Sequence, residues 1–183
     1  MKEEFIISAY TENTIGLLNR ITVIFTRRHV NIESLTVSES ALKGISKFTI
    51  VVRTERALVE KIVQQIEKLV EVLKAFYHTN DEMIYQEIAL YKVSTETLTS
   101  SNTIEQLVRK HGARILEITK DYTVIEKTGH EKETQDLFEG LNLLGVGVLQ
   151  FIRSGRIAIT RSPIEKLSEF LKVRDAILSK QDD

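Results

Sequence analysis

The residues whose types and spacing point most clearly to chemistry lie between positions 11 and 22, in the stretch TENTIGLLNRIT. A strand-like run, FIISAY, precedes it, and a helix-like run, LLNRITVIFTRR, follows. The first turn of a helix exposes backbone N–H groups and a partial positive charge, so such a corner can hold a carboxylate or a phosphate. The side-chain amide of Asn13 both donates and accepts hydrogen bonds. Gly16 lets a ligand approach the backbone, and Leu17 and Leu18 offer apolar surface.

These residue types suit a small zwitterion with an aliphatic side chain, such as an amino acid. The structural alternative is that Asn13 or Thr14 is the N-cap of an ordinary helix. In that case Gly16 lies just inside the helix and is tolerated at a cost of about 1 kcal/mol. Helix physics alone favours this second interpretation, because every helix has a cap.

Catalytic and metal sites have little support in the sequence. The four histidines fall in four different predicted elements, and no H-x-x-x-H or H-E-x-x-H pair occurs, so we expect no metal site. The run GLNLLGVGVLQ contains G-x-G but lacks the third glycine and leads into a strand, unlike a dinucleotide-binding loop. The absence of cysteine excludes disulfides, thiolate ligands and cysteine nucleophiles. We therefore expect no catalytic residue and no cofactor bound by this chain.

The composition also argues against nucleic acid and membrane as partners. The formal net charge is only −1 although 28% of the residues are charged, so no general attraction to nucleic acid or acidic lipid is expected. The stretch KGISKFTI is similar to the third strand of an RNA-recognition module, but that module stacks bases on several aromatic residues and only Phe48 is in place. No run approaches the roughly 18 apolar residues of a membrane-spanning helix. We expect a soluble, cytoplasmic protein.

Two copies of one pattern of elements must position the corner. Strands have apolar residues at alternate positions, and helices have them three or four positions apart. In the first copy the order is strand 5–11, helix 17–28, strands 30–39 and 45–53, helix 56–69 and strand 70–78. In the second copy it is strand 85–93, helix 102–111, strands 113–119 and 122–128, helix 131–144 and strand 146–155. This predicts an α+β fold of two ferredoxin-like βαββαβ domains, 1–79 and 84–161, with helices on one face of each antiparallel sheet.

The second face of each sheet needs a cover of its own. In the first domain Val51, Leu73 and Ile6 are candidates for that face, and we expect dimerisation through a sheet face or edge. The tail, 162–183, begins with Ser162-Pro163-Ile164-Glu165, which has serine, proline and glutamate where a capping box places them. We expect a C-terminal helix that packs on the second domain, and a helix that docks on a partner is the alternative.

The stretch TENTIGLLNRITVIFTRRHVNIESLTVSES resembles the start of the small, regulatory subunits of acetolactate synthase, also called acetohydroxyacid synthase. The shared pattern is E-N-x-x-G-x-L-x-R, then F-x-x-R, then N-I-E-S-L-T-V, and the later runs KLVEVLK and RSGRIAITR are similar too. The resemblance covers residues 4–163. It identifies the first domain as an ACT domain, the amino-acid-sensing version of this fold, and the second as ACT-like.

The resemblance implies a regulatory subunit of branched-chain amino acid (valine, leucine and isoleucine) biosynthesis, with no catalytic centre. Such a subunit binds the large catalytic subunit, in which thiamine diphosphate, Mg and FAD are expected. It raises the activity of that subunit and confers feedback inhibition, usually by valine. It forms a homodimer through the ACT domains, with the effector between the corner of one chain and the second strand of the other. Carried over to this sequence, the effector residues are Asn13, Thr14, Ile15, Gly16, Leu17, Leu18, Asn31 and Ile32.

The second repeat departs from this pattern, because it has STETLTSSN where the first has TENTIG. We therefore expect effector sites in the first domain only, and a structural or partner-contacting role for the second. Two other functions remain open. One is a free-standing ACT-type regulator of another enzyme or of a transcription system, and the other is a stand-alone enzyme, which no residue cluster supports.

Overall fold

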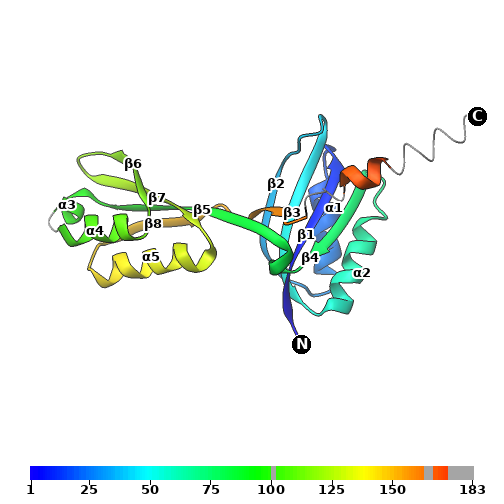
Figure 1. Cartoon of the computed structure of the whole chain (residues 1–183), viewed down its shortest axis with the longest axis horizontal. Coiled ribbons are helices and arrows are strands. Elements are labelled where there is room, and N and C mark those ends of the chain that lie inside the picture. Colours follow the sequence, from blue (N-terminus) through cyan, green and yellow to red (C-terminus); the bar gives the residue numbers. More distant parts are fainter. Residues whose placement is uncertain (100–101, 163–166, 173–183) are drawn as a thin grey trace, which may run out of the picture. The chain divides into compact units, whose positions relative to one another are not determined.

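A computed structural model describes residues 1–99, 102–162 and 167–172 of the chain. The chain divides into two compact units. The first contains Met1–Ile84 and the described residues from Ala158 onward, and the second contains Tyr85–Ile157 (Figure 1). No helix among the described residues is long and apolar enough to cross a membrane.

The first unit has the predicted βαββαβ order. Its elements are β1 (Glu3–Glu12), α1 (Leu17–Thr26), β2 (Ile32–Glu39), β3 (Ile45–Thr54), α2 (Arg56–Ile66) and β4 (Val72–His78). The strands form one antiparallel sheet in the order β2-β3-β1-β4. Both helices lie on the same face of that sheet (Figure 1), so the predicted ferredoxin-like fold is confirmed.

The core of this unit lies between the sheet and its two helices. Alternate residues of β1 point into it, and each helix adds a stripe of residues three or four positions apart. The main contributors are Phe5, Ile7, Ala9, Leu17, Ile21, Phe25, Ile50, Val52, Val59, Ile62 and Ile66. Each large side chain buried in this way stabilises the fold by about 1.5–3 kcal/mol, which holds the β1–α1 corner in place.

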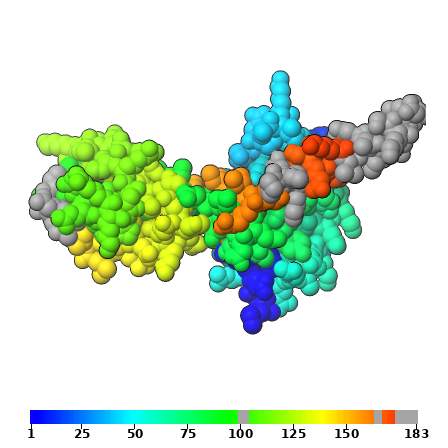
Figure 2. All heavy atoms as spheres, in the orientation of Figure 1, coloured from blue at the N-terminus to red at the C-terminus, as the bar shows by residue number. Residues whose placement is uncertain are grey.

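The second face of the first sheet is covered by the end of the same chain. Ile6 and Val51 are register partners on that face, and they are 0% and 1% exposed. The Lys47 ammonium donates a 2.6 Å hydrogen bond to the backbone oxygen of Ala158. Figure 2 shows the orange and red atoms of this C-terminal segment against the first unit.

This cover corrects the prediction made for the C-terminal helix. Residues 167–172 are helical, and Leu167 is only 2% exposed. The Lys74 ammonium lies 5.6 Å from the centre of the Phe170 ring. The closing helix therefore packs in the first unit rather than on the second domain, because the apolar sheet face that needs a cover is there. The predicted capping box falls mainly on 163–165, outside the described residues.

The second unit repeats the layout with additions. Its elements are β5 (Met83–Ser94), α3 (Thr95–Thr99), α4 (Asn102–Lys110), β6 (Arg114–Ile118), β7 (Tyr122–Gly129), α5 (Glu131–Leu143) and β8 (Val148–Arg153). The sheet order is β6-β7-β5-β8. A 3₁₀ turn (Asn80–Glu82) precedes β5, and a short strand, β9 (Ile157–Thr160), pairs with β5. Strand β9 was not predicted from the sequence. The second domain was expected to extend to 161, whereas Ala158 belongs to the first unit.

Candidate effector site

The β1–α1 corner is a tight turn held by backbone hydrogen bonds. The N–H of Asn13 donates to the oxygen of Gly44 at 3.3 Å, and the N–H of Thr14 donates to Glu12 at 3.0 Å. The N–H of Leu17 then donates to the oxygen of Thr14 at 3.3 Å. Because these bonds involve only the backbone, the side chains of Asn13 and Thr14 remain exposed to solvent.

Gly16, rather than Asn13 or Thr14, is the N-cap of α1. Its φ of 84° and ψ of −6° are left-handed, and no side chain caps the helix. The prediction that Asn13 or Thr14 is the N-cap of this helix is therefore wrong. A Cβ added to Gly16 would meet nothing within 4 Å, so the glycine is required by its backbone conformation and not by crowding. It lies outside the helix interior, where the expected propensity cost would have applied.

The start of α1 presents free backbone donors. Within the described part of the chain, no acceptor lies within hydrogen-bond reach of the N–H groups of Ile15, Gly16, Leu18 and Asn19. An uncapped helix start of this kind carries a partial positive charge and can bind an anion.

The apolar residues of the corner have different roles. Ile15 is fully exposed and Leu18 is 48% exposed, so both can contact a ligand. Leu17 is 2% exposed and belongs to the core. Its predicted role as ligand surface is corrected, because its side chain anchors the first turn of the helix in the core.

Asn31 and Ile32 lie at the other end of the sheet. Ile32 is in register with Val52, which pairs with Phe5 near the start of β1. The corner follows Glu12, at the end of β1. Glu12 is seven positions after Phe5, which corresponds to about 23 Å along a strand. One chain therefore does not bring the predicted site residues together.

An ion pair between Arg20 and Glu71 holds the corner and was missed by sequence reasoning. Their side chains are 2.6 Å apart. The N–H of Glu12 donates to the backbone oxygen of Glu71 at 2.9 Å. The hydrogen bond from Arg20 lowers the pKa of the Glu71 carboxyl. No local pattern links residues so far apart in the sequence, so only the folded arrangement of α1 and β4 reveals the pair.

The matching corner of the second unit is built differently. Helix α3 begins at Thr95, directly after β5 ends at Ser94. The hydroxyl of Thr95 donates to the backbone oxygen of Thr119 at 2.9 Å. This corner has no glycine, and a threonine side chain ties it to a neighbouring turn.

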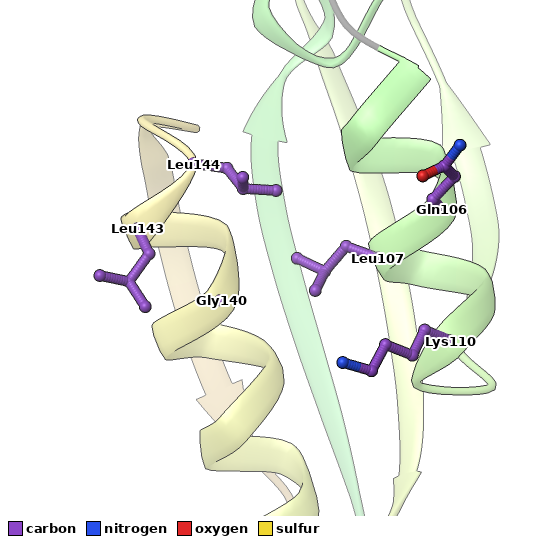
Figure 3. Close-up of a pocket in the computed structure, with 6 residues that line it drawn as sticks. All are labelled: Gln106, Leu107, Lys110, Gly140, Leu143 and Leu144. Atoms are coloured by element: carbon purple, nitrogen blue, oxygen red, sulfur yellow. The ribbon is translucent and has the colours of Figure 1, made fainter.

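The second unit also has a groove and a polar cluster. A groove of about 340 Å³ lies between α4 and α5 (Figure 3), and it is lined by Gln106, Leu107, Lys110, Gly140, Leu143 and Leu144. Its lining is mostly aliphatic, with one lysine at the side. It offers no set of converging polar groups that would orient a ligand.

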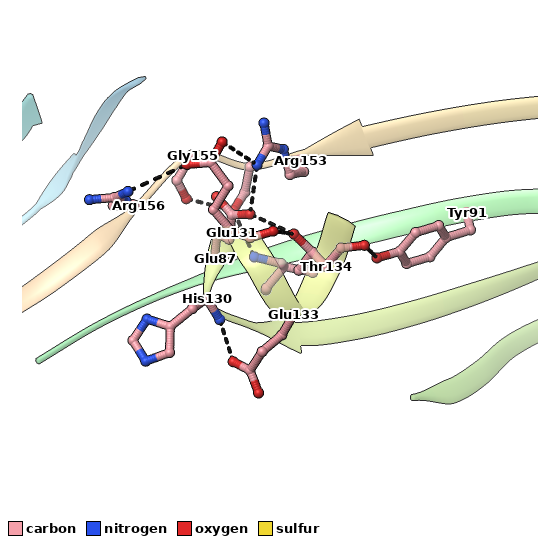
Figure 4. Close-up of polar contacts among 11 residues, drawn as sticks. Glu87, Tyr91, His130, Glu131, Glu133, Thr134, Arg153, Gly155 and Arg156 are labelled. Atoms are coloured by element: carbon pink, nitrogen blue, oxygen red, sulfur yellow. Dashed lines mark hydrogen bonds and ion pairs between the residues drawn. The ribbon is translucent and has the colours of Figure 1, made fainter. Parts of the chain in front are cut away.

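A polar cluster joins β5, α5 and β8 in the second unit (Figure 4). Glu87, 5% exposed, accepts a 2.8 Å hydrogen bond from the Thr134 hydroxyl and lies 3.3 Å from Arg153. Arg153 also pairs with Glu131, which contacts Arg156 as well. Two carboxylates are balanced by two guanidinium groups, so the cluster is a structural support. No group of three or more potential metal ligands occurs among the described residues.

Known proteins are similar to most of the chain. Residues 86–162 match the family model for the small subunit of acetolactate synthase, and residues 7–74 match the model for the AHAS small subunit-like ACT domain. The acetolactate synthase small subunit of Bacillus subtilis is 34% identical over 164 residues, covering 89% of this chain and 94% of that protein.

A second relative and a solved structure are also similar to most of the chain. The probable acetolactate synthase small subunit of Methanothermobacter thermautotrophicus is 33% identical, covering 85% of this chain and 92% of its own length. The crystal structure of the small subunit from Thermotoga maritima superposes with a TM-score of 0.78 at 29% identity, covering 88% of this chain and 99% of that one.

Proposed function

Because the chain belongs to the acetolactate synthase small-subunit family, we propose that it binds the catalytic subunit, raises its activity and confers feedback inhibition by valine. It is a regulatory subunit without a catalytic centre of its own. In this proposal the thiamine diphosphate, Mg and FAD belong to the catalytic partner, and the complex works in the cytoplasm.

The proposal that the chain senses valine rests on one observation. The predicted site residues are far apart within a single chain. Strand β2 is an edge of the first sheet. In an antiparallel pair of β2 strands from two copies, the start of one strand lies beside the end of the other. The end of β2, Glu39, pairs with Ser46 and so lies level with Thr11, beside the corner. A homodimer through β2 therefore brings Asn31 of one chain to the corner end of its partner.

The chemistry of the corner fits valine. The valine carboxylate accepts hydrogen bonds from the free N–H groups near Gly16, and each charge-assisted bond contributes about 1.5–3 kcal/mol. The isopropyl group packs against exposed Leu18 and contributes a similar amount. After the cost of association, a dissociation constant in the micromolar to millimolar range is expected. Such a sensor releases valine when its concentration falls.

Two substitutions of Gly16 separate charge from backbone strain. Asn and Asp tolerate the left-handed conformation better than other residues, and only Asp places a carboxylate where the ligand's own is expected. We expect Gly16→Asp to lose valine binding in calorimetry and valine inhibition in the reconstituted enzyme, with activation retained. Gly16→Asn, the matched control, keeps both. Equal valine responses of the two variants would show that the corner does not hold the carboxylate.

Co-purification tests the partner. We expect the catalytic subunit to be retained by this chain, with higher activity in its presence and lower activity when valine is added. Retention of a different enzyme or of a transcription factor, with no effect on acetolactate synthase, would instead favour the free-standing regulator.

A further inference from the structure

The outer strand of the second sheet, β6, is exposed along its whole length. All five residues from Arg114 to Ile118 are exposed, and the large aliphatic side chains of Ile115, Leu116 and Ile118 are 42%, 51% and 64% exposed. Figure 1 places β6 at the edge of its sheet, and the same yellow-green segment lies on the surface in Figure 2. Edge strands carry unpaired backbone groups that can pair with another chain.

A bulge gives β6 an unusual arrangement of charges. Arg114 is in register with Glu126, and Glu117 is in register with Val124, so Leu116 is an extra residue in the strand. Without a bulge, residues three positions apart lie on opposite faces of a strand. With it, Arg114 and Glu117 share one face.

The same bulge aligns the apolar residues on the other face. Ile115 is in register with Ile125, and Ile118 is in register with Thr123. Ala113, next to Arg114, packs against the core of this unit. Ala113, Ile115 and Ile118 therefore share the helix-covered face.

These two faces make the edge complementary to itself. We propose that β6 pairs antiparallel with β6 of a second copy, with Arg114 opposite the second copy's Glu117 and Ile115 opposite its Leu116. Ala113 then lies opposite Ile118. Residues opposite each other in an antiparallel pair point to the same face, and the Arg114–Glu117 and Ala113–Ile118 pairs meet that condition. Two-fold symmetry forms every contact twice.

Charge favours a second copy as the occupant of this edge. Glu117 has no ion-pair partner within the described part of the chain, and the proposed register gives it one. Arg114 is kept on the correct face by its contact with Glu126. The β6 pairing is separate from the proposed valine site and does not depend on it.

Disulfide trapping tests the register directly, because the chain has no cysteine. Full-length Ala113→Cys and Ile118→Cys proteins are mixed under mild oxidation, and the mixed disulfide dimer is quantified by mass spectrometry. We expect it to form readily. The matched control mixes Ala113→Cys with Glu117→Cys, whose thiol lies one residue away on the opposite face, and we expect at least about tenfold less product. Circular dichroism checks that each variant is folded.

Charge reversal provides the second arm. Adding Glu117→Arg to the Ile118→Cys protein places a positive charge opposite Arg114 of the Ala113→Cys protein. This should reduce the yield of the mixed disulfide at least about tenfold. Adding Arg114→Glu to the Ala113→Cys protein restores both opposite-charge contacts and should restore the yield. Similar yields in the main and control mixtures, or no rescue by the second reversal, would overturn the proposal. Valine titration of the single-cysteine proteins reports separately on the first unit.

Discussion

The two units share one layout but differ in what lies on the second face of the sheet. In the first unit Ile6 and Val51 are almost completely buried, and Lys47 on the same face is bonded to Ala158 of the C-terminal segment. In the second unit Ile88 and Ile152 are 45% and 57% exposed. The same order of strands and helices is therefore compatible with a closed face and with an open one. The helix-covered core specifies the layout, and the second face is free to take other roles.

The corners that follow the first strand of each unit also differ. The first unit has a left-handed glycine and free helix donors at Gly16. The second has Thr95, whose hydroxyl is bonded to Thr119. Because both units fold with the same topology, the glycine corner is not a requirement of the fold. This supports a binding role for it.

The largest expected effect comes from truncating the covered face. Ile6→Ala removes a fully buried side chain and leaves a cavity, so we expect the first unit to lose about 2–5 kcal/mol. Ile152→Ala, at the matching open face, should cost the second unit less than about 1 kcal/mol. Hydrogen exchange of peptides from β1 and β5 measures each unit separately. Equal losses would show that the two faces are equally covered in solution.

A smaller effect is expected from the glycine corner. Gly16→Ala puts a Cβ in the left-handed region and should destabilise the first unit by about 1–2 kcal/mol. Gly147→Ala is the control, because Gly147 has neither a positive φ nor a neighbour within 4 Å of an added Cβ. Thermal unfolding of the two variants compares them. An unchanged melting temperature for Gly16→Ala would mean that the corner adopts another conformation in solution.

The fold was predictable from the sequence because it depends on local periodicity. The alternation in β1 and the stripe in α1 each lie within a dozen residues, and both were predicted correctly. The cover on the second face was not predictable, because Lys47 and Ala158 are 111 residues apart. Gly16 could be singled out from its position, but its capping role depends on φ, which the residue type does not determine. Asn31 and Ile32 belong to the predicted site only if a second copy is present.

The smallest expected effect concerns two carboxyl groups, one in each unit. The pKa of Glu71 is lowered chiefly by the hydrogen bond from Arg20, whereas that of Glu126 is lowered chiefly by the hydrogen bond from Thr128. A carboxyl whose pKa is lower in the folded state stabilises the protein above its unfolded pKa, and this contribution is lost as the pH falls through the folded value. Both contributions should therefore disappear below about pH 4.

Removing the partner of one carboxyl distinguishes the two. Arg20→Met removes the main cause of the Glu71 shift, so the Glu71 pKa should rise toward its ordinary value and the acid-sensitive contribution of the first unit should shrink. Glu126 depends on Thr128 and Arg114, so its pKa should not change, which makes it an internal control. Carbon-detected NMR titration of the glutamate carboxyls measures both groups in one sample. If Glu126 moved together with Glu71, the corner of the first unit would be coupled to the second sheet, and the two units could not be treated as electrostatically independent.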